Sequence, residues 1–190
     1  MFPVDTFQKT LAKIEAILVR HEIRFHLTGG LTGTAYGEPR MTQDIDLVID
    51  PDQTGRVVDH LVESLAESDF MFDEPALRQA VKKGGMFQLL DQREVLKLDM
   101  YPRELIEGEL SRSEQLEIFE GTMLPVVCRV DAAASKLVWI SKGSHKSRRD
   151  LRAIHRGANQ TQQAEIANLA EKLGLGSLLT EVLAEPDEIA

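Results

Sequence analysis

The chain has 190 residues, of which 43% are apolar and 28% are charged, and its formal net charge is −9. A chain of this length and composition can bury one core, with room for a small helical appendage. The excess of acid excludes a protein coated in basic surface for non-specific binding of nucleic acid. The single cysteine, Cys128, excludes an internal disulfide framework and a cysteine-rich zinc site.

Neither a secretory signal nor a membrane span is expected from the hydropathy pattern. The N-terminal segment contains an early acid, Asp5, and lacks the apolar run of a signal peptide. No apolar stretch approaches the roughly 20 residues that a bilayer requires. We therefore expect a cytoplasmic protein without membrane contact, and a bacterial-type cytosol fits best.

The first 129 residues alternate between helical and strand patterns. In chain order the patterns predict a helix over 5–21, a strand over 24–28, a helix over 31–36, a strand over 44–49, a turn over 51–55, a helix over 57–65, paired strands over 87–90 and 95–101, and edge strands over 117–119 and 123–128. Cys128 is predicted to be a buried strand residue.

From residue 131 onward the pattern is helical. Helices are predicted over 131–142, 147–157, 161–173 and 176–184, with glycines between them. The expected fold class is α+β, with a small mixed β-sheet core and helices over 1–129. A helical C-terminal region over 130–190 follows, and we expect it to complete the active site.

Two aspartates lie one residue apart in the predicted strand 44–49. Because side chains alternate between the faces of a strand, Asp44 and Asp46 project from one face, and Ile45, Leu47 and Ile49 project from the other face into the core. Two such carboxylates, about 7 Å apart along the strand, can hold one hard cation or bridge two. Mg²⁺ commonly binds through one or two carboxylates together with substrate phosphates. The pair therefore predicts a site for Mg²⁺ and a nucleoside triphosphate, and the alternative is an ordinary exposed acidic strand face.

A Gly29-Gly30 pair precedes this strand, between a predicted strand and a predicted helix. Without a Cβ atom the backbone can approach a ligand closely, and the N–H groups of the following turn can face an anion. The hydroxyls of Thr32 and Thr34 lie nearby in the sequence. The pair thus predicts a phosphate-binding turn, and the alternative is a tight turn without a ligand.

The two features together resemble a known signature. Gly29-Gly30, thirteen intervening residues and then Asp44-Ile45-Asp46 are similar to the motif of the DNA polymerase beta-like nucleotidyltransferase superfamily. The resemblance implies that the glycines hold the triphosphate of a nucleotide substrate and that the acidic pair binds two Mg²⁺ ions. The string PRMTQDIDLVI, with Arg40 and Thr42, resembles the AbiEii-like abortive-infection toxins, and this implies that both residues bind the nucleotide.

Asp99 is the candidate for a third carboxylate. Two-metal chemistry needs a further ligand for the metal that activates the attacking hydroxyl. Alternation along 95–101 places Lys97, Asp99 and Tyr101 on one face of the strand. Asp99 also matches the position of the family's third aspartate, and it could serve as the general base. The alternative is a carboxylate that only faces solvent.

The C-terminal helices contribute Lys136 and Asp150. Lys136 lies within an apolar stripe of a helix for which Asp131 is a good N-cap. Either its ammonium reaches past the edge of the core to water, or, as the family's Lys-Leu motif implies, it contacts the triphosphate. Asp150 has capping-box spacing from Ser147. The resemblance implies instead that Asp150 orients the lysine or the nucleotide, although the family's usual Lys-Asp is Arg149-Asp150 here and a second acid is replaced by Ala153.

The sequence favours a nucleotidyltransferase that moves a nucleoside monophosphate from a triphosphate to an acceptor hydroxyl and releases pyrophosphate. The predicted catalytic residues are Asp44, Asp46, Asp99 and Lys136. The resemblance implies a toxin of a toxin–antitoxin or phage-defence system that acts on tRNA and has an antitoxin protein as partner. A regulatory module that binds a nucleotide without transferring it, and an enzyme with a protein or small-molecule acceptor, are the alternatives.

A basic segment over 142–156 bears on the acceptor. Arg148, Arg152 and Arg156 recur every four residues and so line one face of the predicted helix. A row of guanidinium groups suits the phosphate backbone of an RNA acceptor. The alternative is a helix face whose charges are offset by nearby acids.

Overall fold

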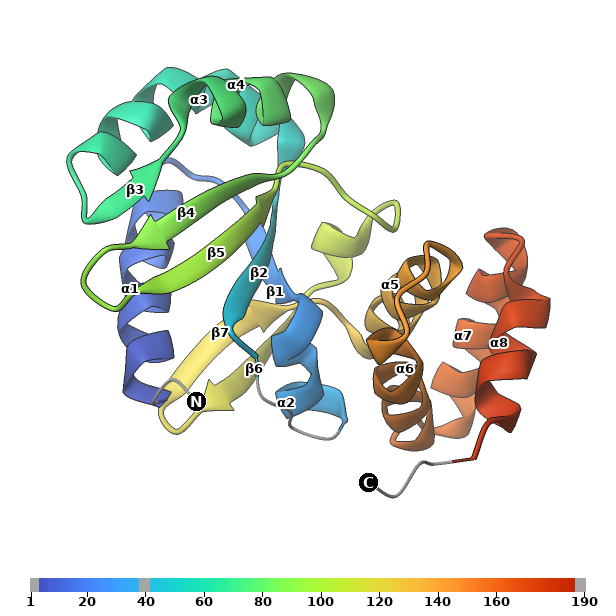
Figure 1. Cartoon of the computed structure of the whole chain (residues 1–190). Coiled ribbons are helices and arrows are strands. Elements are labelled where there is room, and N and C mark those ends of the chain that lie inside the picture. The colour runs from blue at the N-terminus through green and yellow to red at the C-terminus, as the bar shows by residue number, and fades with distance from the viewer. Residues whose placement is uncertain (1–3, 38–41, 187–190) are drawn as a thin grey trace. The chain divides into compact units, whose positions relative to one another are not determined.

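The computed structural model describes residues 4–37 and 42–186. Within them lie a seven-stranded mixed sheet and eight α-helices (Figure 1), which confirms the α+β prediction. The described residues form two units: 4–31 with 42–127, which holds the whole sheet, and 32–37 with 128–186, which is helical. No helix in the described part of the chain is long and apolar enough to cross a membrane.

The sheet of the first unit places β1 and β2 at its centre. Its strands in chain order are β1 (Phe25–Thr28), β2 (Asp44–Ile49), β3 (Phe70–Phe72), β4 (Phe87–Asp91), β5 (Leu96–Tyr101), β6 (Glu114–Phe119) and β7 (Thr122–Val126). Their order across the sheet is β3-β4-β5-β2-β1-β7-β6. The pairs β2–β5 and β1–β7 are parallel, and the other neighbouring pairs are antiparallel. Only β6 of the two predicted edge strands lies at an edge, because β7 pairs with β1 as well.

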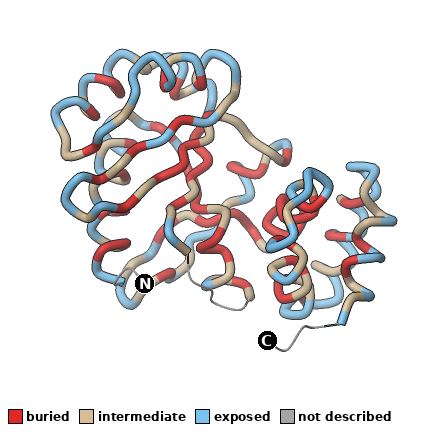
Figure 2. Tube along the Cα trace, in the orientation of Figure 1, coloured by how far each residue is buried: buried red, intermediate tan, exposed pale blue. Residues whose placement is uncertain are grey.

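Three longer helices accompany the sheet. They are α1 (Val4–Arg20), α3 (Pro51–Ala66) and α4 (Glu74–Lys83). The apolar stripe of α1, including Leu11 and Leu18, is buried, and the helix packs against β5 and α3. Figure 2 shows the buried positions concentrated along the central strands and on the inner faces of these helices.

The helical unit is built around α5. Its helices are α2 (Thr32–Tyr36), α5 (Arg129–Ser141), α6 (Lys146–Arg156), α7 (Gln160–Lys172) and α8 (Gly176–Ala184). Most of α5 is buried, and it packs against α6, α7 and α8. The guanidinium of Arg129 lies 4.7 Å from the centre of the Tyr36 ring and donates to the Tyr36 carbonyl at 2.9 Å. This contact ties the short α2 to the helices that follow much later in the chain.

The structure contains two features that the sequence analysis missed: the start of α3 near residue 51 and the elements between residues 66 and 86. The predicted turn over 51–55 is the first turn of α3, because Asp50 caps the helix by accepting from the Gln53 N–H at 2.9 Å. Proline is well tolerated at the first helical position, so Pro51 begins the helix here. The pair β3 and α4 was not predicted at all. Asp73 caps α4 in the same way.

Two predictions of local detail in 128–150 were wrong, and one of the two alternatives for Asp150 is excluded. Cys128 is buried but lies at the N-cap of α5, beyond the end of β7. Asp131 lies inside the first turn of α5, buried, where it accepts from the Cys128 Sγ at 3.2 Å. The helix α6 begins at Lys146 without a side-chain cap, so Ser147 and Asp150 form no capping box.

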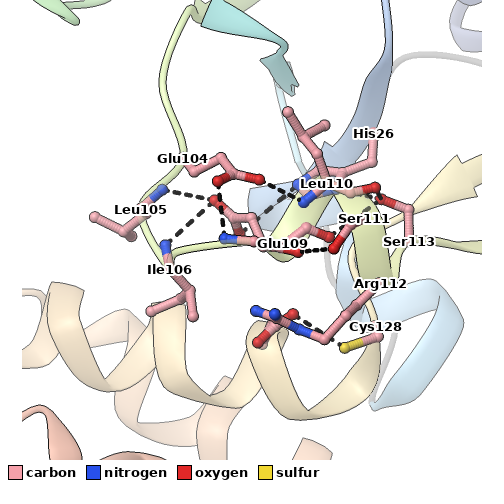
Figure 3. Close-up of polar contacts among 12 residues, drawn as sticks. His26, Glu104, Leu105, Ile106, Glu109, Leu110, Ser111, Arg112, Ser113 and Cys128 are labelled. Atoms are coloured by element: carbon pink, nitrogen blue, oxygen red, sulfur yellow. Dashed lines mark hydrogen bonds and ion pairs between the residues drawn. The ribbon is translucent and has the colours of Figure 1, made fainter.

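Two glutamates organise the connection from β5 to β6 (Figure 3). Glu104 accepts from the backbone N–H groups of Gly108 at 2.8 Å and Leu110 at 2.9 Å. Glu109, almost fully buried, accepts from the N–H of Leu105 at 2.6 Å. Glu109 is buried and Glu104 is half-buried, and between them they satisfy backbone donors of the loop that would otherwise lack partners within the protein.

His26 of β1 lies next to this loop in the interior. Its Nδ1 is 2.7 Å from the Ser113 hydroxyl and its Nε2 is 3.8 Å from a Glu109 oxygen. Burial lowers the pKa of His26 to about 4. The imidazole is therefore neutral at pH 7, and its contact with Glu109 is not an ion pair there.

We expect His26 to make the fold sensitive to acid between pH 6.5 and 4. In that range the unfolded chain, whose histidine has an ordinary pKa near 6.5, binds a proton that the folded protein excludes. The contribution of His26 is complete above pH 6.5, and the free energy of unfolding should fall by on the order of 3 kcal/mol as the pH drops to 4. Urea unfolding of the protein and of His26→Gln across this range measures the difference. Equal slopes for the two proteins would contradict the expectation.

Candidate active site

Three carboxylates share one face of the paired strands β2 and β5. The parallel register places Asp46 opposite Asp99 and Asp44 opposite Lys97. Neighbouring strands lie about 4.8 Å apart, and residues two apart on one strand share a face. The structure therefore brings Asp44, Asp46 and Asp99 to one patch, from segments 53 residues apart in the sequence.

The glycine turn lies against the middle carboxylate. Thr28, at the end of β1, pairs with Asp46, and Gly29 follows with a positive φ of 65°. A Cβ atom on Gly29 would lie 1.9 Å from the Asp46 Oδ2 atom, so no other residue leaves room for that carboxylate. The Gly30 N–H also points to Asp46 Oδ2, at 3.4 Å. The turn and the carboxylates thus form a single corner of the first unit.

Each carboxylate has a neutral hydrogen-bond donor nearby. The Thr42 hydroxyl donates to Asp44 Oδ1 at 2.9 Å, and the Gln88 amide donates to Asp99 Oδ1 at 3.0 Å. The Tyr101 hydroxyl lies 3.4 Å from Asp46 Oδ1. Thr42, which was predicted to bind the nucleotide, therefore holds a metal-ligand candidate here. Gln88 was not predicted, because only the antiparallel register of β4 and β5 places it beside Asp99.

Lys97 is the cation of this patch. Its Nζ atom is 3.0 Å from Asp99 Oδ2 and 3.5 Å from Asp44 Oδ2. Burial is the largest influence and opposes the charge, but the hydrogen bond and charge of Asp99, with those of Asp44, outweigh it and raise the pKa of Lys97. Burial and the charges of Asp46 and Asp99 also raise the pKa of Tyr101, which keeps its hydroxyl a donor.

The donor set fits a hard divalent cation in kind. Three carboxylates on one face supply the oxygen ligands that Mg²⁺ prefers, and the absent Cβ of Gly29 leaves space for the middle one. In the described part of the chain no three His, Cys, Asp or Glu side chains are arranged closely enough to hold a metal ion as they stand. The ammonium of Lys97 lies between two of the carboxylates.

The other predicted nucleotide-binding residues are placed differently. Arg40 lies outside the described residues. Thr32 begins α2 and is buried, so its hydroxyl faces protein here. Lys136 and Asp150 belong to α5 and α6 of the helical unit. Their roles toward a nucleotide remain predictions.

Lys136 and Asp150 form a buried ion pair. Their charged atoms are 2.7 Å apart, and the side chains are only 8% and 9% exposed. The ammonium of Lys136 therefore does not extend to water, and Asp150 holds the lysine instead of capping α6. The pairing explains how a lysine can occupy the apolar stripe of α5, because a charge inside a protein needs an opposite charge and hydrogen bonds.

The basic face of α6 is partly neutralised within the helical unit. Arg148 bonds to Glu181 at 2.9 Å and also pairs with Glu185. Arg152 pairs with Glu185 at 2.6 Å and is only 11% exposed. Two of the three arginines predicted to line a phosphate-binding face are thus engaged by acids at the C-terminal end of the chain.

The fold is similar to the folds of nucleotidyltransferases. It is similar to the structure of an antigenic nucleotidyltransferase-like protein from Paracoccidioides brasiliensis, with 20% identity, 94% of each chain covered and a TM-score of 0.54. It is also similar to the antibiotic-resistance factor ANT(2'')-Ia, with 16% identity, 95% of this chain and 91% of that chain covered, and a TM-score of 0.51. A comparison with curated proteins finds no match.

The family is established by the sequence itself. Residues 14–174 match the profile of the nucleotidyl transferase AbiEii toxins of type IV toxin–antitoxin systems. This match covers most of the chain, so the protein belongs to the AbiEii family and is a nucleotidyltransferase that uses a nucleoside triphosphate.

Replacing Gly29 should disturb both the fold and the patch. Gly29→Ala places a methyl group on the Asp46 carboxylate and forces alanine to a positive φ, with an expected loss of about 1–3 kcal/mol in the free energy of unfolding. Gly121→Ala is the matched control, because Gly121 has a φ of 73° and nothing within 4 Å of the added atom. Urea unfolding compares the two. An equal loss in both variants would show that the contact with Asp46 does not affect the free energy of unfolding.

The buried ion pair of Lys136 and Asp150 should contribute to the stability of the helical unit. Lys136→Met leaves Asp150 charged and buried, so we expect a loss of about 3–5 kcal/mol in the free energy of unfolding. The double variant Lys136→Met/Asp150→Leu replaces both charges by apolar groups and should regain most of that loss. Additive losses in this double-mutant cycle would contradict a coupled pair.

Proposed function

We propose that the protein is a Mg²⁺-dependent toxin that transfers a nucleoside monophosphate from a nucleoside triphosphate to the hydroxyl of an RNA acceptor such as tRNA. One observation carries the proposal: the register of β2 and β5 sets Asp46 opposite Asp99, with Asp44 on the same face and the Gly29 turn against Asp46. An antitoxin partner is proposed with the family membership alone as its support.

The proposed roles follow from the positions of the groups. Asp44 and Asp46 would hold two Mg²⁺ ions, and Asp99 would complete the site of the ion nearest the acceptor. When bound, such ions neutralise charge on the phosphates and make the acceptor hydroxyl more acidic. The turn at Gly29 and Gly30 would hold the triphosphate. Thr32, Arg40, Lys136 and Asp150 are proposed as further nucleotide-binding residues, on the family resemblance only.

The transfer is a substitution at the α-phosphorus. The acceptor oxygen bonds to that phosphorus, the bond to the oxygen that bridges to the β-phosphorus breaks, and pyrophosphate leaves. Asp99 would take the proton of the acceptor hydroxyl, with one of its oxygens oriented by the Gln88 amide. Thr42 would keep the Asp44 carboxylate in place.

A small-molecule or protein acceptor is the second candidate. The observation that favours it is the pairing of Arg148 and Arg152 with Glu181 and Glu185, which lowers the positive charge that α6 could offer to an RNA backbone. Incubation with each α-labelled triphosphate, Mg²⁺ and total RNA separates the candidates. Label in RNA supports the proposal, label in protein or in a small molecule supports the second candidate, and no label at all contradicts transfer and favours a regulatory nucleotide-binding module.

Asp46→Asn should abolish transfer and leave the fold intact. Loss of a metal-binding carboxylate removes several kcal/mol of stabilisation of the transition state, so the rate should fall at least about a hundredfold. Stability should not fall, because Asp46 shares its face with two other acids and one repulsion is removed. Asp59→Asn is the control, since Asp59 is an exposed acid of α3. A normal transfer rate in Asp46→Asn with Mg²⁺ as the metal would refute the assignment.

A further inference from the structure

Lys97 shares the face of the carboxylate patch. It lies two residues before Asp99 on β5 and opposite Asp44 on β2, so its side chain projects to the same side as both acids. Its Nζ atom is within 3.0 Å of Asp99 and 3.5 Å of Asp44. The side chain is 39% exposed, and four flexible carbons carry its charge. The ammonium can therefore leave the patch without disturbing the core.

A second lysine of the same unit, Lys13, also lies between two aspartates, but one of its partners is fully buried. Lys13 bridges Asp91 at 2.9 Å and Asp69 at 3.7 Å. Asp91 is completely buried and also accepts from the Thr10 hydroxyl at 2.8 Å, so this bridge fixes α1 to the end of β4. The Asp44 side chain, in contrast, is 35% exposed. Solvent can therefore reach this carboxylate, as the exchange of Lys97 for a metal ion requires.

We propose that Lys97 is an internal counter-cation that occupies the place of a divalent metal between Asp44 and Asp99 and must be displaced when the metal binds. The inference rests on the proposed function, because that function gives these two carboxylates to Mg²⁺. In the absence of metal the ammonium offsets the repulsion among three acids on one strand face. The same ammonium then competes with the metal for the same oxygens.

The competition couples metal binding to the substrate. A divalent cation alone must displace Lys97 and leave an ammonium close to it, and this like-charge contact weakens its binding. A triphosphate brings negative charge to the same corner, to which the displaced ammonium can turn. The metal is therefore expected to bind more tightly when the triphosphate is present than when it is absent. The site would then take up its metal mainly together with its substrate.

The direct test is the binding of Mn²⁺ alone, followed by the electron paramagnetic resonance of the free ion. Mn²⁺ accepts the same oxygen ligands as Mg²⁺. Lys97→Met should bind Mn²⁺ about tenfold more tightly than the unaltered protein, because the competing charge is gone. Lys9→Met is the control for charge, since Lys9 is exposed and pairs only with Asp5 at 2.6 Å in its own helix among the contacts described. Its Mn²⁺ affinity should equal that of the unaltered protein.

Thermal stability gives a second readout that does not depend on activity. Both Lys97→Met and Lys13→Met should melt earlier than the unaltered protein in metal-free buffer. Lys97→Met removes the ammonium between Asp44 and Asp99. Lys13→Met removes the cation of the buried Asp91, while Asp69 keeps its pairing with Arg93 at 2.8 Å. Addition of Mn²⁺ should restore the melting temperature of Lys97→Met and leave that of Lys13→Met unchanged. Restoration of both, or of neither, would overturn the inference.

Asp46→Asn separates a failure of this inference from a failure of the proposed function. If Asp46→Asn loses Mn²⁺ binding while Lys97→Met binds it as the unaltered protein does, the metal site stands and the role of Lys97 is refuted. If Asp46→Asn binds Mn²⁺ normally, the metal assignment itself falls, and the inference falls with it. Unchanged Mn²⁺ binding together with weaker triphosphate binding in Lys97→Met would identify a fixed phosphate ligand and also overturn the proposal.

Discussion

Repulsion among three carboxylates on one face of two paired strands is the constraint on which the site depends. Asp46 and Asp99 are opposite each other in the β2–β5 register, and Asp44 shares their face. Like charges across neighbouring strands are unfavourable, so the surrounding groups are cations and donors: the ammonium of Lys97 and the neutral groups of Thr42, Gln88 and Tyr101. The glycine at position 29 admits the middle carboxylate to the turn. A patch held in this way suits the proposed chemistry on a triphosphate, which requires added positive charge.

The helical unit shows a different use of charge. Lys136 and Asp150 neutralise each other in a nearly dry environment, and Arg148 and Arg152 are matched by acids of α8 and the residue after it. The first unit also pairs charges, as Lys13 does with the buried Asp91, but at one corner it gathers three carboxylates around a single ammonium, that of Lys97. The net charge of −9 is therefore an incomplete guide to partners, because it does not tell which acids are already paired. For the acceptor, the pairing inside the helical unit weighs against a broad basic surface on α6.

The fold could be predicted where local signals were strong. The strand 44–49 and the helix 176–184 were predicted with the bounds that the structure has, because the β-branched and apolar residues after Asp44 favour a strand and glycine precedes a helical pattern at 176. The signals failed where one pattern fits two structures. An aspartate followed by a proline starts a turn as readily as a helix, and in α3 it starts a helix. The three residues of β3 are too few to show a period, and only pairing with β4 makes them a strand.

The sequence by itself determined the family and the shared face of Asp44 and Asp46. A segment of 18 residues contains Gly29, Gly30, Asp44 and Asp46. Local alternation was enough to put the two acids on one face of a strand. Only the tertiary structure decided which distant groups meet them. The parallel register of β2 and β5 sets Asp99 beside Asp46 and brings Lys97 to Asp44, and the packing of α5 on α6 joins Lys136 to Asp150. Register and packing depend on the burial of whole faces, so no short segment carries that information.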